Sequence, residues 1–581
     1  SRILKRKFFK NTTKEIRLKD LIAEYNIYDC KATYELFMKI KTSLEEIVRQ
    51  TSPKLPECPF PLDIKHPFEF ISISHIAMKI FENICGDKHD PAIFPPSISM
   101  EIDSTMYAGR TDFTILGEYT SKGNLAYWDV TSEYPLAMTA KYPIGDWQLF
   151  SEDFLNQLRH EVSSVFFKRK DQFDQGLKVD DDLSYFNYIK TMFFCRIDAY
   201  PPPQEFCCLW APLATRFNDK MEEATSVDDV TRLAFTFDII KNRYVNSIQL
   251  KTLLLAGYSV EILDMEYQDK SVYWRDSDYI MLPYIEVIGK LKEEARDTNK
   301  SYAKILKLIL NSLAGKMGQK SVHSVGTFVH NWQFTPDDYN EGDYTSENFW
   351  ARNGTTFYMN DGECERPCKT HNHYMASFIW AYANWIMYTS MIRLHTDAIN
   401  AKLDLKAKAG IVLYCDTDSL VIDMSRASKV TFVEGENIGR YIDEKHDFNS
   451  TWKCKYEKFD SLIVFAKKSY LVIKNDKNIC RKLKGIRDKD ADKISLVLAR
   501  EMIKKFMDNE TSKESFPIVR LARSRVNEFP VSQRVISHMY TCKSLDFTKY
   551  YSVCGSSREE DKNQNCVFCS SRWPPETPMS Q

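Results

Sequence analysis

The side chains best suited to chemistry lie in three short segments spread over about half of the chain. Asp129 follows the apolar run 125–128, and Asp416 and Asp418 lie between two further apolar runs. Lys307 and Asn311 are spaced to share one face of a predicted helix. In-line nucleotidyl transfer requires carboxylates that hold two Mg²⁺ ions and a cationic helix that holds a triphosphate. Together, the three segments predict this chemistry.

The strongest single signal is the pair Asp416 and Asp418, flanked by the apolar triplets 411–413 and 420–422. If these residues form a strand, the two carboxylates point the same way and Thr417 points to the other face. Such close like charges repel each other unless a cation lies between them, and unpaired carboxylates are costly in a core. The alternative is an Asp-rich turn at the surface. Asp129, at the end of its own predicted strand, is the natural third carboxylate, although a lone Asp there is more often a turn or cap residue.

The basic residues of the predicted helices fit a phosphate ligand. Lys307, Asn311 and Gly315 are four residues apart and share a helix face, where lysine supplies a point charge and glycine leaves space. Lys292 and Arg296 are likewise four apart on the preceding predicted helix. The alternative for this second pair is an ordinary solvated basic face.

Composition limits the classes of protein that the chain can belong to. Its 581 residues predict several domains, and its net charge of −1 argues against a simple basic nucleic-acid binder. The stretch 467–505 nevertheless holds 13 basic and 5 acidic residues. The 15 cysteines, an odd number, favour an intracellular, reducing compartment, and we expect no membrane span. Because the sequence starts without Met, we expect a fragment or a processed product.

Periodicity predicts strands mixed with separate helical blocks, which indicates an α+β fold. The predicted strands are 123–131, a hairpin at 409–424 and 460–475, with a turn at Pro135. The predicted helices are 284–315, interrupted at 297–299, then 374–395 and 490–508. Residues 325–372 are polar and aromatic, and indicate an insertion of loops and short strands.

These segments resemble motifs A, B and C of family B DNA polymerases, written D-x-x-S-L-Y-P, K-x-x-x-N-S-x-Y-G and Y-x-D-T-D-S. They correspond here to residues 129–135, 307–315 and 414–419. Lesser elements of the same family follow in the right order. They are a Y-x-x-x-D exonuclease motif (Tyr25, Asp29), a linker Y-x-G (Tyr107, Gly109), K-x-Y (Lys468, Tyr470) and K-x-K-G (Lys482, Lys484).

The resemblance implies a role for each matching residue. Asp129 and Asp418 would be the principal Mg²⁺ ligands, with Asp416 in support, and Tyr134 would lie under the incoming sugar and exclude a 2′-hydroxyl. The residues implied for binding the nucleotide are Tyr134, Lys307, Asn311, Gly315, Lys292 and Arg296. The residues implied for positioning primer and template are Ser132, Thr417, Lys468, Tyr470, Lys482, Lys484, Tyr107 and Gly109.

The chain departs from the family pattern in three places. Glu133 replaces the usual Leu of motif A, and Ala314 replaces the Tyr of motif B. Of the exonuclease motifs, only the last, with Tyr25 and Asp29, is present, and two-metal hydrolysis needs more than one carboxylate. We therefore expect no proofreading by this chain.

The architecture that the resemblance implies is a right hand with a truncated N-terminal exonuclease domain. The expected parts are the exonuclease remnant and linker (1–95), the first part of the palm with an insertion (96–283), the fingers (284–318), an insertion of the protein-primed type (319–373), the second part of the palm (374–454), and the thumb with a cysteine-containing tail (455–581). The long gaps around motif B are most like the protein-primed branch of linear plasmids, viruses and self-synthesising transposons. The alternative is an unrelated expansion of loops.

The expected function is template-directed addition of dNTPs to a primer 3′-hydroxyl, with primer-template DNA, dNTPs and a terminal protein as partners and two Mg²⁺ ions as cofactors. The alternatives are a catalytically impaired DNA-binding remnant and an RNA-templated polymerase. Zn²⁺ is a further expectation at Cys542, Cys554, Cys566 and Cys569, where only the last pair has the usual ligand spacing. Otherwise these four residues are free thiols.

Overall fold

The computed structural model describes about three fifths of the chain. The described residues are 73–85, 94–174, 184–202, 210–217, 232–319, 322–330, 349–353, 356–365, 372–400, 411–427, 432–434, 452–483, 495–507, 513–521 and 538–546, without 108, 116, 236 and 476, and the single residues 31, 38 and 42. The expectations for Tyr25, Asp29, Lys484, Cys554, Cys566 and Cys569 lie outside them, and Cys542 is described in its backbone alone. Across the described helices, none is long and apolar enough to cross a membrane.

The chain divides into two compact units, which we call the first unit (1–86 and 283–312) and the second unit (87–282 and 313–581). The first contains α3 (Ile73–Cys85), α8 (Leu282–Thr298) and most of α9 (Lys300–Met317). Tyr284 joins all three helices, because its hydroxyl donates to the Ile309 carbonyl at 3.0 Å and its ring meets Phe81 edge to face. Asn299 separates α8 from α9 and accepts a hydrogen bond from the Tyr302 N–H, which agrees with the predicted polar interruption.

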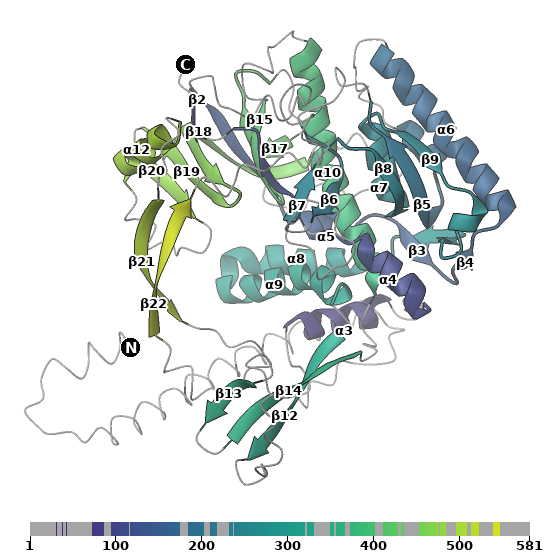
Figure 1. Ribbon diagram of the computed structural model, residues 1–581, viewed down its shortest axis with the longest axis horizontal. Coiled ribbons are helices and arrows are strands. Elements are labelled where there is room, and N and C mark those ends of the chain that lie inside the picture. The colour runs from purple at the N-terminus through teal and green to yellow at the C-terminus, as the bar shows by residue number, and fades with distance from the viewer. Residues whose placement is uncertain are drawn as a thin grey trace, which may run out of the picture. The chain divides into compact units, whose positions relative to one another are not determined.

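The second unit is built on an eight-stranded sheet, here called the main sheet, which runs in the order β1-β15-β16-β2-β18-β19-β20, with β17 beside β18 (Figure 1). Its strands are β1 (Thr111–Phe113), β2 (Gly117–Val130), β15 (Val412–Asp416), β16 (Ser419–Asp423), β17 (Phe432–Glu434), β18 (Trp452–Ala466), β19 (Ser469–Lys474) and β20 (Lys477–Lys482). All its pairings are antiparallel except that of β17 with β18. Apolar side chains of the main sheet form one buried cluster that includes Ala499 of α12 (Leu496–Met507).

A second, five-stranded sheet lies in the chain between β2 and α8. It contains β4 (Gln148–Leu149), β5 (Met192–Tyr200), β8 (Ile240–Asn246), β9 (Ser259–Ile262) and β10 (Val272–Trp274). The long helix α6 (Glu152–Asp174) packs against β9, and α7 (Ser247–Leu255) packs against β5 (Figure 1). The Asn246 side chain accepts from the Ile248 and Gln249 N–H groups and so caps α7, with Gln249 completing a capping box.

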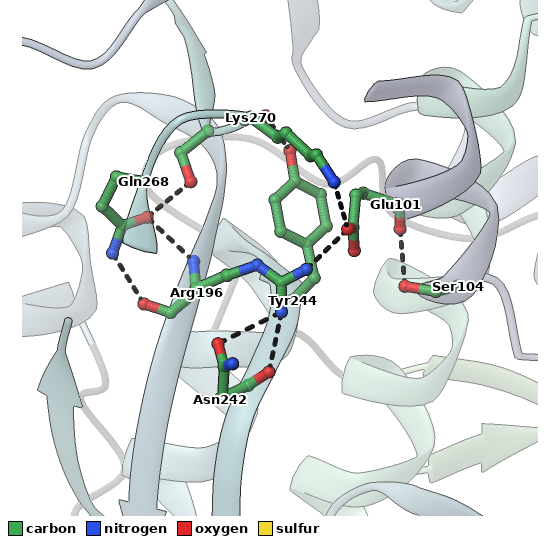
Figure 2. Close-up of polar contacts among 8 residues, drawn as sticks. Glu101, Ser104, Arg196, Asn242, Tyr244, Gln268 and Lys270 are labelled. Atoms are coloured by element: carbon green, nitrogen blue, oxygen red, sulfur yellow. Dashed lines mark hydrogen bonds and ion pairs between the residues drawn. The ribbon is translucent and has the colours of Figure 1, made fainter. Parts of the chain in front are cut away.

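Charged side chains tie α4 (Pro96–Ser104) to this second sheet (Figure 2). Glu101 of α4 accepts from Arg196 of β5 at 2.5 Å and from Lys270 at 3.4 Å. Arg196 also donates to the Asn242 carbonyl of β8, and the Tyr244 hydroxyl donates to the Lys270 carbonyl. Arg196 and Glu101 are each about four-fifths buried, so this pair orients α4 more firmly than an exposed ion pair would.

The helix α10 (His373–Asn400) packs against α4, α7 and the short helix α5 (Glu133–Ala137). A buried hydrogen-bond network joins three of these helices, because Ser377 of α10 contacts Thr105 at 2.6 Å and accepts from Asn246 at 2.9 Å. Two short 3₁₀ helices are also described, η4 (Ser184–Tyr188) and η6 (Met265–Tyr267). Three strand pairs stand outside the two larger sheets: β3 (Tyr142–Ile144) with β11 (Asp276–Asp278), β6 (Ala214–Phe217) with β7 (Arg232–Phe235), and β21 (Lys513–Leu521) with β22 (His538–Asp546). A three-stranded sheet contains β12 (Val322–His330), β14 (Thr356–Glu365) and β13 (Phe349–Asn353). The fold is thus a mixed α and β structure, and the bounds of the six expected parts stay predictions.

Candidate active site

The main sheet brings Asp129 to the hairpin that contains Asp416 and Asp418. Strand β2 lies between β16 and β18, and its register with β16 places Asp129 opposite Ser419, the residue after Asp418. The Val130 N–H then donates to the Asp418 carbonyl at 2.7 Å. Antiparallel pairing therefore joins carboxylate-bearing segments that are distant in sequence.

The expectation that Asp416 and Asp418 alternate along one strand is wrong. Asp416 ends β15, whereas Thr417 and Asp418 form the turn that leads into β16. Thr417 has a φ of 60°, in the left-handed region, and its N–H donates to the Arg110 carbonyl at 2.6 Å. The turn reverses the chain, so the two-residue period of a strand does not apply, and the left-handed residue marks a place where surrounding contacts impose the backbone.

The three carboxylates differ in their surroundings. Asp416 accepts from the Thr111 hydroxyl at 2.8 Å and forms an ion pair with Lys468 at 3.2 Å. Asp129 instead accepts from the Tyr127 hydroxyl at 3.2 Å. Because Asp416 already pairs with a lysine, this arrangement fits the supporting role that the resemblance implies for it.

The implied primer-binding residues cluster on the next strands of the main sheet. Lys468 lies in the turn between β18 and β19 with a φ of 60°, and its N–H donates to the Tyr414 hydroxyl at 2.8 Å. Tyr470 is buried, and its ring lies 4.9 Å from that of Tyr414, so it packs against the tyrosine that holds this turn. Lys482 is exposed on β20, opposite Tyr470 in the strand register.

Gly109 and Tyr107 are held by different contacts. A Cβ at Gly109 would lie 2.3 Å from Cγ2 of Thr417, so only glycine fits against the turn. The half-buried Tyr107 ring contacts two guanidinium groups, of Arg216 at 4.6 Å and Arg243 at 5.1 Å, and its hydroxyl accepts from Arg243. Tyr107 thus belongs to a structural cluster as well as to the implied linker motif.

Sequence reasoning missed a buried ion pair beneath the hairpin. Arg110 and Asp112 are buried and lie 3.3 Å apart, and Lys467 approaches Asp112 at 3.8 Å. The Arg110 guanidinium also lies over the rings of Trp210 and Phe235. Because the Arg110 carbonyl accepts a hydrogen bond from the Thr417 N–H, this buried cluster stabilises the position of the turn. The signal in the sequence was two opposite charges within three residues after Gly109.

The motif A segment turns sharply after β2. Ser132 has a φ of 57° and precedes α5, in which Glu133 and Tyr134 are the first residues. The predicted turn at Pro135 is instead the first turn of α5, where proline is tolerated because no helical partner awaits its missing N–H. Tyr134 is half-buried, and burial is the main cause that raises the pKa of its hydroxyl.

Negative charge is concentrated around Asp129 and Asp418. Burial, and then the charges of Asp418 and Asp129, raise the pKa of Glu133 well above its ordinary value. The same two carboxylates add to the effect of burial in raising the pKa of Tyr127. Glu133 is 3% exposed, and its Oε1 has no hydrogen-bond partner, which costs about 1–3 kcal/mol.

The implied nucleotide-binding residues of the helices lie on α8 and α9. Lys307, Asn311 and Gly315 are all exposed on α9, whereas Ala314 is buried. On α8, Lys292 is half-buried, and Arg296 is exposed in the last turn. The roles of these residues in binding a nucleotide stay predictions.

The second unit contains a pocket of about 590 Å³, including its open mouth, next to the carboxylate turn. Its wall includes Gly109, Glu133, Tyr134 and Thr417, and α10 contributes Trp380, Ala381, Ala383, Asn384, Met387 and Met391. The remaining lining residues are Thr105, Tyr107, Arg110, Pro212, Leu213, Ala214, Phe235 and Gln249. Residues implied for sugar and primer contacts therefore border a single cavity.

The donor set at Asp129 and Asp418 fits Mg²⁺, which prefers one or two carboxylates and takes its other ligands from water and phosphate. Burial is the main cause of the raised pKa of Glu133, and the negative charges of Asp418 and Asp129, which a divalent cation would offset, add to it. Within the described ranges, no group of three acidic, histidine or cysteine side chains is placed to hold a metal ion.

Comparisons with known proteins agree with the motifs. Residues 3–393 match the family model described as DNA polymerase type B, organellar and viral. The DNA polymerase of human adenovirus F serotype 40 is 26% identical over 314 residues, which are 52% of this chain and 24% of that protein. The chain thus matches about a quarter of the length of this curated relative.

Solved structures of phi29 DNA polymerase are also similar. The ternary complex with primer-template DNA and incoming nucleotide substrates has a TM-score of 0.44 and 13% identity, over 79% of this chain and 66% of that chain. The complex with single-stranded DNA has a TM-score of 0.41 and 14% identity, over 75% and 64% of the two chains. On the match of the family model over more than half of its residues, the chain belongs to the organellar and viral type B DNA polymerases.

Proposed function

We propose that this chain is a template-directed DNA polymerase, which adds deoxynucleotides to a primer 3′-hydroxyl. The observation that supports it most is the register that sets Asp129 opposite Ser419 and joins Val130 to the Asp418 carbonyl. This pairing joins the acidic residues' backbones from two separate motifs at one end of the main sheet. The family membership points to the same activity.

Asp129 and Asp418 would hold the metal ions, with Asp416 in support. Two Mg²⁺ ions, when bound, would lower the pKa of the attacking hydroxyl and stabilise the pyrophosphate leaving group. Lys307 and Asn311 would bind the triphosphate, and Tyr134 would exclude a 2′-hydroxyl. Lys468, with its backbone fixed by Tyr414, would contact the primer backbone, where contacts carry little sequence preference.

Primer extension with Mg²⁺ tests this function directly. We expect Asp418→Asn to lower kcat by at least about 10³-fold, because a metal ligand stabilises the transition state by several kcal/mol. Lys290→Gln is the matched control, since Lys290 is exposed and pairs only weakly with Glu294 at 4.0 Å. Equal extension by Asp418→Asn and the unaltered chain would refute the catalytic proposal and favour a DNA-binding remnant. Parallel reactions with RNA templates and ribonucleotides distinguish the RNA-templated alternative.

We further propose protein-primed replication by a right-handed polymerase. The second sheet with α6, inserted between Tyr134 and Lys307, supports a separate docking region for a terminal protein. Initiation on a protein hydroxyl, compared with extension of a plain DNA primer, is the test. This proposal includes the bounds of the palm, fingers and thumb and the remnant of the exonuclease domain. We also propose a reducing compartment, which the buried thiols of Cys195 and Cys415 support. Degradation of single strands from the 3′ end would contradict the expected lack of proofreading.

A further inference from the structure

Among the acidic and amide side chains that line the pocket, Glu133 differs from Gln249 and Asn384. The Gln249 amide donates to the Thr105 carbonyl at 2.8 Å, and the Asn384 amide donates to the Pro212 carbonyl at 3.1 Å. Glu133 is as buried as Gln249 and more buried than Asn384, yet its Oε1 has no partner. The resembled motif has leucine at this position, so the carboxyl is a particular feature of this chain. An unpaired buried oxygen on a cavity wall is a place where a ligand can supply the missing donor.

The charges around the pocket restrict that ligand. Glu133 interacts with the Asp418 and Asp129 carboxylates, so a phosphate group would be repelled here unless bound metal ions offset the charge of those two aspartates. Trp380 and Met387 add apolar surface on the side of α10. A neutral group with one hydrogen-bond donor and an apolar face meets these conditions. The sugar of a deoxynucleotide is such a group, since its 3′-hydroxyl is its one free donor.

The order of the chemical groups along the nucleotide supports the same assignment. In the proposed reaction, the phosphates of the incoming nucleotide lie at the metal ions of Asp129 and Asp418, and the sugar follows directly after the α-phosphate. Glu133 and Tyr134 follow Asp129 in the chain and line the cavity next to the turn at Thr417. The sugar is therefore the part of the nucleotide that would meet this wall.

We propose that Glu133 is a specificity-determining residue, whose carboxyl oxygen accepts a hydrogen bond from the 3′-hydroxyl of the incoming deoxynucleotide. This inference rests on the proposed polymerase function. Glu133 acts by recognising the sugar, and it is neither one of the proposed metal ligands nor one of the implied primer contacts. Nucleotides that lack the 3′-hydroxyl leave the buried oxygen without a partner and are disfavoured.

The test compares dTTP with dideoxy-TTP on one primer-template, using kcat/KM for each. We expect Glu133→Leu to lower the preference for dTTP about tenfold, which corresponds to about 1.4 kcal/mol. Glu133→Gln keeps an acceptor oxygen and should retain the preference within about threefold. Glu101→Gln, in the ion pair of Figure 2, alters a glutamate that does not line the pocket and should leave the ratio unchanged.

An active Glu133→Leu chain with an unchanged ratio would overturn the inference. If the unaltered chain extends with neither nucleotide, the proposed function itself fails. Binding of dTTP and dideoxy-TTP to the complex with a dideoxy-terminated primer gives the same ratio without chemistry, so an inactive variant is still informative. If Glu133→Leu instead changes the preference between hydroxyl-ended and dideoxy-ended primers and not between nucleotides, the assignment to the incoming sugar is wrong.

Discussion

Replacing Gly109 with alanine tests how the carboxylate turn is held. The added Cβ would lie 2.3 Å from Cγ2, 2.7 Å from Oγ1 and 2.8 Å from Cβ of Thr417, all shorter than real Cβ contacts. Thr417 cannot easily give way, because its N–H is bonded to Arg110 and its φ is 60°. Overpacking of this kind costs about 1–3 kcal/mol, and we expect Gly109→Ala to lose stability at the upper end of this range.

The same substitution should affect catalysis more than stability. Relief of the overlap requires the turn of Thr417 and Asp418 to move by about 1 Å, and a misplacement of this size costs about 10²-fold in rate. The assay is urea unfolding together with primer extension at saturating dNTP. Gly315→Ala is the control for stability, since nothing lies within 4 Å of its added Cβ and alanine favours the helix by about 1 kcal/mol.

A double-mutant cycle identifies the cause. Thr417→Gly removes all three close atoms and relieves the left-handed conformation, so Gly109→Ala should cost almost nothing in stability in that background. Additive free energies of unfolding for the two substitutions, within about 0.5 kcal/mol, would refute the reasoning. They would show that Gly109 matters for a reason other than its contact with Thr417.

Three further predictions concern separate parts of the structure. The pKa of Glu133 in the folded chain is raised above its unfolded value near ~4.3. Its contribution to the free energy of unfolding is therefore fully present below the unfolded pKa and is lost as pH rises through the folded pKa, by up to about 1.4 kcal/mol per pH unit. Urea melts in EDTA at pH 5 and pH 8 should therefore show Glu133→Gln gaining stability relative to the unaltered chain at the higher pH, and a constant difference would contradict this. Lys307→Ala should raise the KM for dNTPs about tenfold without lowering the melting temperature, because Lys307 is exposed on α9, and unchanged steady-state kinetics would count against its triphosphate role. Arg196→Met leaves Glu101 without its closest partner and should destabilise the chain by about 1–3 kcal/mol in urea melts, with a loss below about 0.5 kcal/mol as the opposing result.

Local sequence patterns predicted several helices and strands, whereas the conformation of the turn at Thr417 depends on contacts between residues distant in sequence. The polar interruption near Asn299 and the hairpin of β15 and β16 follow from sequence alone, because caps and apolar runs act over a few residues. The alternation of Asp416 and Asp418 failed because Thr417 adopts a turn that the Arg110 carbonyl stabilises. A contact between residues so far apart in sequence leaves no periodic signal. The roles of the site residues themselves stay predictions.

The central position of β2 affects which strands of the main sheet unfold locally. Residues 125–129 are paired with β16 on one side and with β18 on the other, so neither edge of this stretch meets solvent. Segments with such two-sided pairing open only with the largest cooperative unit, and their amides are among the last to exchange with deuterium. The strand that bears Asp129 should therefore stay closed while the edge strand β20, which is paired on one side only, frays. Local opening at that edge of the sheet can then occur without displacing the backbone of Asp129.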